Sequence, residues 1–558
     1  MVVAVSNIFR LFLLICVPCC ICDISYTRPY EKWPTVAISI LVRNKAYSLP
    51  YFLSSLLNLD YPKERIYVWF YSDFNSDNSN EILKDWIKMH SKEYNKIYIT
   101  MNTTSGFKHE DQETPTHWSD GRFRHVIELR ESALKFARLK WADYIFMLDA
   151  DILLTNTLTL KHLVSKGYPI SSPMLMSAST YSNFWCGMDE YYYYKRTDEY
   201  KPILFRKSVG CFDVPMVHSA VLINLKHKSS ELLTYVPEKL RNYDGPVDDI
   251  IVFAVGAQSN DIPIMICNDF VYGFLPVPLE KYNELEDEKS EFVNTKVEIL
   301  GNGIIPPLNN DMEKYVEPPI PDNLDCTEIF MINLKRRTKR RVLMENSFKE
   351  LGLNVTYLKA FDGKTISKTF LEKYDITLLP EYEDPYHKRP MKTGEIGCFL
   401  SHFVLWQRIV DEHLDVTLIL EDDVHFVPDF RRKFLRILDE VKSLDWDFLY
   451  IGRKILMDGE EEYVTDHTTK PLYSYWTLGY VIKERGAKKL LAADPLSKLI
   501  PVDEFIPIMF NQHPSQELKQ HFPVRTLKAL SASPLLVHPT HYVGDIGYIS
   551  DTEDSIVV

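Results

Sequence analysis

The strongest constraint on the fold is a strand-then-helix pattern that starts twice along the chain. Residues 34–42, "PTVAISILV", are β-rich and lead into a stretch with apolar residues at helical spacing. The same order restarts near residue 326 with "EIFMINLKRRTKRRVLM". Alternating strands and helices favour a mainly parallel, doubly wound sheet, whose ligands bind beyond the carboxyl ends of the strands. We therefore predict two tandem Rossmann-like α/β domains.

A change in composition separates the two halves. Residues 283–325 are acid-rich at first and then rich in proline, which favours a semi-rigid linker. We predict an amino-terminal domain at residues 23–282 and a carboxyl-terminal domain at residues 326–558. A chain of 558 residues is long enough to bury a separate hydrophobic core in each.

The first 22 residues predict a signal peptide. Arg10 precedes an apolar run, Leu11 to Cys22, that is too short to span a bilayer. The alternative is a buried strand or helix at the start of a cytosolic protein. No later segment has about 18 continuous apolar residues, so we expect a luminal or secreted chain without a transmembrane segment. Two sequons, at Asn102 and Asn354, are then candidate glycosylation sites.

Cysteine usage and net charge limit the function further. Removal of the signal leaves five cysteines, so at most two disulfides form and no zinc ribbon is expected. They are Cys186, Cys211, Cys267, Cys326 and Cys398. A formal charge of −13 argues against nucleic acid as a partner.

The first acid cluster follows an apolar strand in "YIFMLDADIL", residues 144–153. Asp149 and Asp151 at the exposed end of a buried strand form a hard oxygen site for Mg²⁺ or Mn²⁺. Acids also end strands merely because the next turn is exposed, so the pattern needs structural support. His218 either completes that metal shell or is a hydrogen-bonded histidine beside a strand.

Other polar positions of the first half have two interpretations each. Asp73, at the end of a predicted strand, lies where such sheets commonly recognise a nucleoside. In "DGPVDDIIVF", Asp244, Asp248 and Asp249 either hold an acceptor or cap a helix. Capping is favoured for Asp248 and Asp249, because apolar residues follow immediately.

The second acid cluster, in "TLILEDDVHF", contains Glu421, Asp422 and Asp423. Three adjacent carboxylates repel one another unless a cation lies among them, so a divalent metal is expected here too. Because side chains alternate in direction at a strand end, Glu421 and Asp423 can face one ligand while Asp422 faces another.

Cations near this cluster suit a diphosphate. They occur in "INLKRRTKRR", "FDGK" and "FLYIGRK", and the candidate binding residues are Arg336, Arg337, Arg340, Asp362, Lys364 and Arg453. The alternative for the basic run is the solvated start of a helix, because charge clusters are usually exposed faces.

Ordered motifs in the second half closely resemble glycosyltransferase family 25. They include "INLKRRTKRR", "AFDGK", "GEIGCFLSHFVLW", "LILEDDVHF", "WDFLYIGRK" and "PVDEFIPIMF". This family contains bacterial lipooligosaccharide galactosyltransferases and animal enzymes that galactosylate procollagen. The first half, with "MLDADIL" and "HSAVLINL", looks like the amino-terminal domain of the animal enzymes. The resemblance implies two nucleotide-sugar transferase domains of the GT-A type.

The resemblance also implies a reaction and a compartment. Galactose would pass from UDP-galactose to 5-hydroxylysine of collagen or procollagen chains, with Mn²⁺, in the endoplasmic reticulum lumen. An α-linked donor and a β-linked product imply inversion, which needs a general base on the acceptor hydroxyl. Asp503 or Glu504 of "PVDEF" is the expected catalytic base, with Asp494 and His402 as alternatives. Asp545 is another acid that could face the acceptor.

Because the family motifs lie in the second half, the Glu421–Asp423 cluster is the expected catalytic metal site. For the Asp149 and Asp151 pair, the favoured expectation is a second metal and nucleotide-sugar site with a structural role. The alternatives are that this site catalyses a second transfer or that it is vestigial. One inverting reaction needs only one metal–diphosphate site.

Two other functions remain open at this stage. A non-enzymatic family member acting in cell adhesion is disfavoured because all three acids of the cluster are present, and a glucosyltransferase would differ at one sugar hydroxyl. The chain ends in "SDTEDSIVV", without a KDEL-type retention signal. Lysyl hydroxylase is therefore a candidate partner that could retain the chain. A homodimer with a second copy of the chain is a separate expectation.

Overall fold

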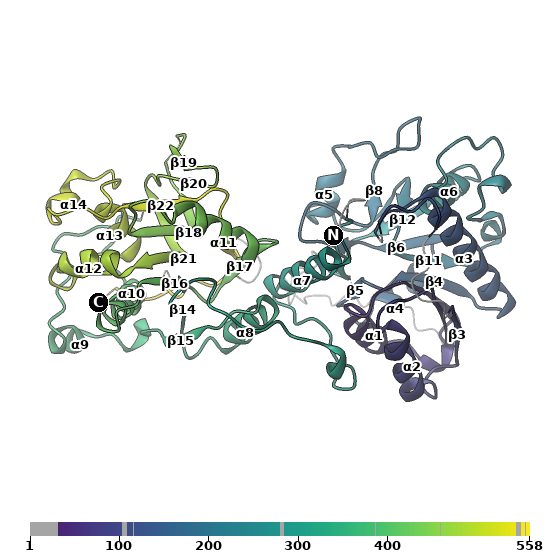
Figure 1. Cartoon of the computed structure of the whole chain (residues 1–558), viewed down its shortest axis with the longest axis horizontal. Coiled ribbons are helices and arrows are strands. Elements are labelled where there is room, and N and C mark those ends of the chain that lie inside the picture. The colour runs from purple at the N-terminus through teal and green to yellow at the C-terminus, as the bar shows by residue number, and fades with distance from the viewer. Residues whose placement is uncertain are drawn as a thin grey trace, which may run out of the picture.

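The computed structural model describes eight ranges of the chain (Figure 1). They are 32–102, 109–114, 116–279, 284–385, 387–457, 459–542, 548–552 and 554–557. The predicted signal peptide, residues 1–22, and the candidate base Asp545 lie outside them. Within these ranges, no helix combines the length and apolar character that a membrane span requires.

The amino-terminal domain is built on an eight-stranded sheet of order β3-β2-β1-β4-β11-β6-β12-β9. Its strands are β1 (Val36–Val42), β2 (Ile66–Ser72), β3 (Lys96–Met101), β4 (Tyr144–Asp149), β6 (Ile170–Pro173), β9 (Cys211–Asp213), β11 (Ala220–Asn224) and β12 (Ile264–Cys267). The first four in space are parallel, but β11 is antiparallel to both neighbours. The sheet is therefore mixed: the β3–β4 side and the β6–β12 pair are parallel as expected, whereas β11 and β9 pair in the antiparallel direction.

Helices cover both faces of this sheet (Figure 1). They are α1 (Leu49–Leu57), α2 (Ser79–His90), α3 (Asp120–Leu139), α4 (Thr159–Lys166), α5 (Tyr200–Leu204) and α6 (Asp249–Gln258). On β4, Phe146 and Leu148 pack with α1, α2 and α4, whereas Ile145 and Met147 pack with α3 and α6. This alternation explains why β4 is apolar from Ile145 to Leu148. Short strands complete the domain: β5 (Leu153–Leu154), β7 (Leu175–Met176), β8 (Phe184–Trp185), β10 (Met216–Val217) and β13 (Gly273–Phe274).

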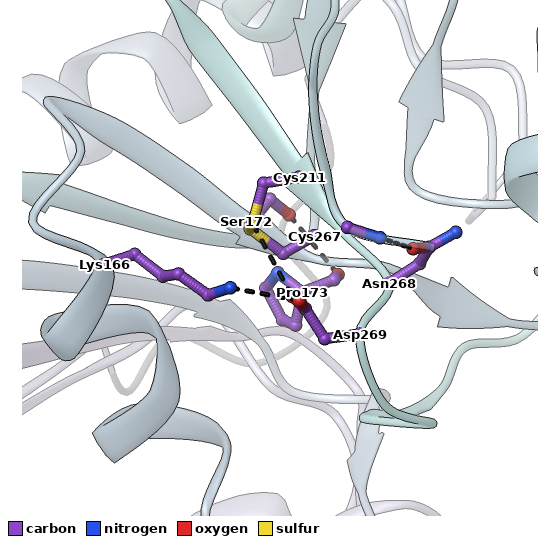
Figure 2. Close-up of a disulfide and its surroundings, with 8 residues drawn as sticks. Lys166, Ser172, Pro173, Cys211, Cys267, Asn268 and Asp269 are labelled. Carbon is purple, nitrogen blue, oxygen red and sulfur yellow. Dashed lines mark hydrogen bonds and ion pairs between the residues drawn. A yellow bond between two sulfur atoms is a disulfide. The ribbon is translucent and has the colours of Figure 1, made fainter. Parts of the chain in front are cut away.

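A disulfide closes one edge of this sheet (Figure 2). It joins Cys211 on β9 to Cys267 on β12, which are directly opposite in the antiparallel register. Beside it, Lys166 forms an ion pair with Asp269 at 3.0 Å. Cys186, Cys326 and Cys398 are free thiols.

The carboxyl-terminal domain has a second eight-stranded sheet, of order β15-β14-β16-β21-β18-β22-β20-β19. Its strands are β14 (Glu328–Asn333), β15 (Thr356–Lys359), β16 (Val416–Leu420), β18 (Phe448–Ile455), β19 (Tyr463–Thr465), β20 (Thr468–Thr469), β21 (Ser474–Lys483) and β22 (Ala529–Ala532). β17 (Val424–Phe426) pairs separately with β23 (Val537–Pro539). β14 is parallel to β15 and β16, and β21 is antiparallel to β16 and β18.

Helices again form a layer on each face of the sheet. They are α8 (Thr338–Leu351), α9 (Lys368–Lys373), α10 (Thr393–Asp411), α11 (Phe430–Val441), α12 (Glu484–Ala492), α13 (Val502–Met509) and α14 (Gln516–Gln520). One core joins α10, α12 and α13 to the sheet, and the other joins α8 and α11 to its opposite face. The prediction of two α/β domains is confirmed.

A long helix, α7 (Leu285–Gly301), lies between the two domains (Figure 1). Its Phe292 and Ile299 pack in a cluster with amino-terminal residues, while Val297 packs in a carboxyl-terminal core. Lys296 also forms a buried ion pair with Glu350 of α8. The region predicted as a linker thus contains a helix that is packed on both sides.

Candidate active site

The three acids form the turn between β16 and β17, at the carboxyl end of a central strand. Asp422 is buried and accepts hydrogen bonds from Asn333 Nδ2 at 2.6 Å and from Arg340 Nη1 at 3.1 Å. The same Arg340 atom lies 3.0 Å from Asp423 Oδ2. Asp422 is therefore held by protein groups, whereas Glu421 and Asp423 each keep part of their surface exposed.

Glu421 and Asp423 experience different electrostatic environments. Burial opposes ionisation of Glu421, but the nearby His402, with Nε2 3.8 Å from Oε1, and a hydrogen bond from Thr477 Oγ1 at 2.5 Å lower its pKa. Burial and the charges of Glu421 and Asp422 raise the pKa of Asp423 to about 7, although Arg340 opposes this. One monocation does not compensate three carboxylates, so the arrangement suits a further cation.

Asp503, in the first turn of α13, is close enough to this cluster for the charge of Glu421 to act on its carboxylate. It is half-buried, and burial followed by the charges of Glu421 and Glu504 raises its pKa to about 8. Its carboxylate accepts a hydrogen bond from the backbone of Trp476, which has a φ of +68° beside an irregularity in the β18–β21 pairing. The next residue, Thr477, donates to Glu421, so this irregular strand end positions both acids.

Glu504 is next to Asp503 in sequence but points into the core. It is 1% exposed and accepts hydrogen bonds from Tyr473 and Tyr475, and His513 Nε2 lies 2.6 Å from its carboxylate. The Glu504 carboxylate is therefore enclosed by protein groups rather than directed toward a ligand. Of the two predicted bases, Asp503 alone has exposed surface beside the acid cluster.

A cavity of about 420 Å³ adjoins the acid cluster, which is within the usual size range of small-molecule sites. Asp422 and Asp423 line one side, and the amino-terminal turn of α8 lines another. The unpaired N–H groups and dipole of a helix amino terminus attract anions. Leu300 and Gly301 of α7 complete the wall, so the interdomain helix is part of this site.

Arg336, Arg337 and Arg340 of the predicted diphosphate-binding set all line this cavity. Arg336 and Arg337 both donate to Asp551, and Arg336 also donates to Asp362 at 2.9 Å. Asp362 additionally accepts from the backbone N–H of Lys364, whose side chain is exposed.

Arg453 is located differently. Its buried guanidinium donates to Ser531, Ser474 and Glu461, all within the β18–β22 side of the sheet. These contacts stabilise the strand ends and leave no exposed side-chain surface for a diphosphate. The predicted role for this residue therefore has no support from its environment.

Each acid of the first pair forms an ion pair with a protein cation. Asp149 accepts from Arg130 Nη2 at 3.0 Å, and the same guanidinium binds buried Asp249 at 2.5 Å. Asp151 pairs at 2.9 Å with Lys45, which also contacts Glu288 of α7 at 3.0 Å. This site is therefore connected to the interdomain helix.

The predicted neighbours of this pair are hydrogen-bonded. His218 is buried, with Nδ1 at 2.8 Å from Ser219 Oγ and Nε2 at 3.2 Å from Tyr181 OH, and burial lowers its pKa to about 4. Asp73 is buried against His125 Nε2 at 2.9 Å.

The capping interpretation of "DGPVDDIIVF" is supported for one residue. Asp248 caps α6 by accepting from the backbone N–H groups of Ile250 and Ile251. Asp249 instead begins the helix and binds Arg130, so it is an ion-pair residue in the first turn. Asp244 accepts from Tyr192 OH at 3.0 Å at the surface.

Replacing Arg130 by Met should lower the free energy of unfolding by about 3–5 kcal/mol, because it leaves Asp249 buried without its partner. Urea unfolding followed by tryptophan fluorescence measures this change. Arg124→Met on the same helix is the matched control: it breaks only an exposed pair with Glu238 at 3.7 Å and should cost less than about 1 kcal/mol. Equal effects of the two variants would contradict the structural importance of Arg130.

The candidate glycosylation sites differ in accessibility. Asn354 is exposed before β15. Asn102 is half-buried and donates from Nδ2 to Tyr71 OH at 2.9 Å, and the rest of its sequon lies outside the described residues.

Two family models match the chain in the order of its domains. "Glycosyltransferase family 25, N-terminal domain" matches residues 33–296, and "Glycosyltransferase family 25 (LPS biosynthesis protein)" matches residues 326–506. With its two α/β sheets and strand-end carboxylates, the protein is a two-domain glycosyltransferase. It belongs to glycosyltransferase family 25.

Full-length relatives agree with this assignment. A glycosyltransferase 25 family member from Anopheles gambiae is 48% identical, over 94% of this chain and 90% of the relative. Procollagen galactosyltransferase 1-A from Xenopus laevis is 45% identical (95% and 88%), and human procollagen galactosyltransferase 2 is 43% identical (94% and 84%). A mannosyltransferase structure from Pyrobaculum calidifontis, solved with GDP-Man and Mn²⁺, is 14% identical over 51% of this chain and 72% of that chain, with a TM-score of 0.28. A score this low supports no inference.

Proposed function

We propose that this glycosyltransferase transfers galactose from UDP-galactose to the hydroxyl of 5-hydroxylysine in collagen-type chains. The cavity that joins Asp422 and Asp423 of the acid cluster to the basic amino terminus of α8 carries the proposal. It offers oxygen ligands on one side and cationic groups on another, as a metal-bound diphosphate requires. The names of the Xenopus and human relatives support galactose as the sugar and procollagen as the acceptor.

In this proposal, Asp503 is the general base of one in-line displacement. It accepts the proton of the acceptor hydroxyl as that oxygen bonds to the anomeric carbon of galactose. The bond from that carbon to the diphosphate breaks, and UDP leaves with the electron pair. Arg340 lines the cavity beside Asp422 and Asp423, so its guanidinium can neutralise part of the charge on the departing diphosphate.

The residues of the acid cluster fit a divalent ion such as Mn²⁺. Glu421 and Asp423 supply partly exposed carboxylate oxygens, and Arg340 is the one arginine that contacts the cluster in the described part of the chain. When bound, the ion would supply charge neutralisation at the diphosphate.

The Asp149 and Asp151 pair is proposed to have a structural role. Each carboxylate is held by a cation of its own domain, and Lys45 joins Asp151 to Glu288 of α7. Because α7 also lines the cavity at the acid cluster, this pair supports the position of that wall.

The proposed compartment is the endoplasmic reticulum lumen. The predicted signal peptide, the exposed Asn354 sequon and the Cys211–Cys267 disulfide support an oxidising secretory compartment. Domain boundaries at 23–282 and 326–558 and a role for lysyl hydroxylase or self-association stay predictions.

The test is an assay of the purified chain with UDP-galactose or UDP-glucose, Mn²⁺ and a hydroxylysine-containing collagen peptide. Product mass and release of UDP are measured. Transfer of galactose alone is the expected result. Transfer of glucose alone would identify a glucosyltransferase, and no transfer of either sugar would favour a non-enzymatic relative.

Replacing Gly301 by Ala tests the role of α7 in donor binding. A Cβ there would lie 2.5 Å from His425 Cδ2, so the ring must shift and its ion pair with Glu298 at 3.0 Å is disturbed. The shifted ring would distort the cavity wall, and overpacking typically costs about 1–3 kcal/mol. If about 1.4 kcal/mol of this cost falls on the bound state, UDP binds about tenfold more weakly, which calorimetry measures. Gly459→Ala, whose Cβ would be 3.5 Å from Leu472, is the matched control. Unchanged UDP affinity in Gly301→Ala would exclude this wall from the donor site.

A further inference from the structure

A thiol, an imidazole and a carboxylate converge behind the acid cluster. Cys398 and His402 are one turn apart on α10, and Glu421 follows β16. One ligand atom of each residue lies within 4.8 Å of the other two, and His402 Nε2 is 3.8 Å from Glu421 Oε1. In the part of the chain that the structure describes, the other such trio contains the Cys211–Cys267 disulfide, which removes its thiolates.

The two ring nitrogens of His402 have different neighbours. The side chain is 1% exposed, and its Nδ1 lies 2.9 Å from Tyr480 OH. Its Nε2 faces Glu421 and lies 3.2 Å from Thr477 Oγ1, a contact that a bound metal would replace. Tyr480 OH also accepts from Trp406 Nε1 at 3.0 Å, which fixes the phenol. If Nδ1 donates to Tyr480 OH, Nε2 is the unprotonated nitrogen that can bind a metal, because a hydrogen bond at one ring nitrogen sets the tautomer.

The charge around the thiol favours a cation. Besides Glu421, the carboxylates of Asp503 and Asp423 act on Cys398. No lysine or arginine is among the groups that act on it most strongly. The three ligand types, sulfur, nitrogen and oxygen, are those that bind Zn²⁺, whereas Mn²⁺ prefers oxygen.

We propose that Cys398, His402 and Glu421 form a binding site for Zn²⁺ or an ion of similar softness. Binding replaces the Cys398 thiol proton, which leaves to solvent, and involves no change of oxidation state. A consequence that rests on the proposed function is inhibition, because Glu421 then serves this ion instead of the ion that assists transfer. The site is thus a point at which zinc can control the reaction.

The test uses the full chain, freed of metal and titrated with Co²⁺ as a spectroscopic substitute for Zn²⁺. A thiolate-to-Co²⁺ charge-transfer band in the near ultraviolet is expected, and one equivalent of Zn²⁺ should remove it. Cys398→Ser should lose the band, and His402→Gln should weaken Co²⁺ binding by at least tenfold. Cys186→Ser is the matched control, because Cys186 is a free, half-buried thiol outside the trio, and it should keep the band.

Thermal melting of each variant verifies that it is folded. Absence of the band in the wild type, or its survival in folded Cys398→Ser, would overturn the site. The band does not depend on sugar transfer. If the band is present in a chain that transfers no galactose, the proposed function is wrong but the metal site is supported. Galactose transfer that is insensitive to Zn²⁺ while the band is present would overturn the inhibitory consequence.

Discussion

Replacing Glu421 by Gln or Asp423 by Asn is expected to lower kcat for galactosyl transfer by about 10²–10³-fold, the effect of losing one preorganised electrostatic contact in an active site. Both substitutions keep the shape of the side chain and remove its charge. The carboxylates are the proposed oxygen ligands of the divalent ion, so Mn²⁺ binding should weaken as well. Steady-state rates with UDP-galactose and a hydroxylysine peptide measure the first effect, and Mn²⁺ electron paramagnetic resonance measures the second.

Asp439→Asn is the control for these two variants. Asp439 is an exposed acid on α11 of the same domain, so its loss should leave both readouts within twofold. The amino-terminal domain stays unchanged throughout. Full activity in Glu421→Gln and Asp423→Asn would contradict the assignment of chemistry to this cluster.

Strand ends were the part of the site that sequence reasoning could locate. An apolar run that stops at acids places those acids at the carboxyl edge of a sheet, and both Asp149 and Glu421 lie there. The strand pattern likewise identified the start of β14 near residue 326. These inferences need only local pattern, because burial on both faces requires continuous apolar strands.

The state of each acid pair was not predictable, because it depends on residues distant in sequence. Arg130 binds Asp149 from 19 residues away, and Lys45 reaches Glu288 across 243 residues. Likewise, Arg453 was expected at the end of a strand as a diphosphate ligand, yet it lies within β18 and donates to Ser531 and Glu461. Sequence shows that a cation is present but not which anion it meets.

The sequence of the interdomain helix does contain a helix signal, but the acidic and proline-rich composition of residues 283–325 favoured a linker instead. Glu284 and Asp287 form a capping box at the start of α7, and apolar residues recur at Phe292, Val297 and Leu300. The prolines that suggested a linker all follow this helix. Its role in the cavity, by contrast, depends on packing against α8 and β17 and has no local signature.

Asp503→Asn is expected to lower kcat by about 10²–10⁴-fold, the usual contribution of a general base. The amide cannot accept the proton of the acceptor hydroxyl, while donor binding should change less than about twofold. The pH dependence follows from the same role. A base acts only when deprotonated, and burial with the charge of Glu421 raises the pKa of Asp503 to about 8. The wild-type rate should therefore rise with pH through the acid limb, and a cation at Glu421 should move that limb downward.

The residual activity of Asp503→Asn should lack the acid limb, which separates a base from a residue that only supports the fold. Glu504→Gln is the informative neighbour, because its carboxylate bonds Tyr473, Tyr475 and His513 in the core. That variant should melt at lower temperature and keep the acid limb in the fraction that remains folded. If Asp503→Asn keeps the wild-type pH profile, proton transfer must be assigned to another group. A lost limb in Glu504→Gln with normal melting would identify that group as Glu504.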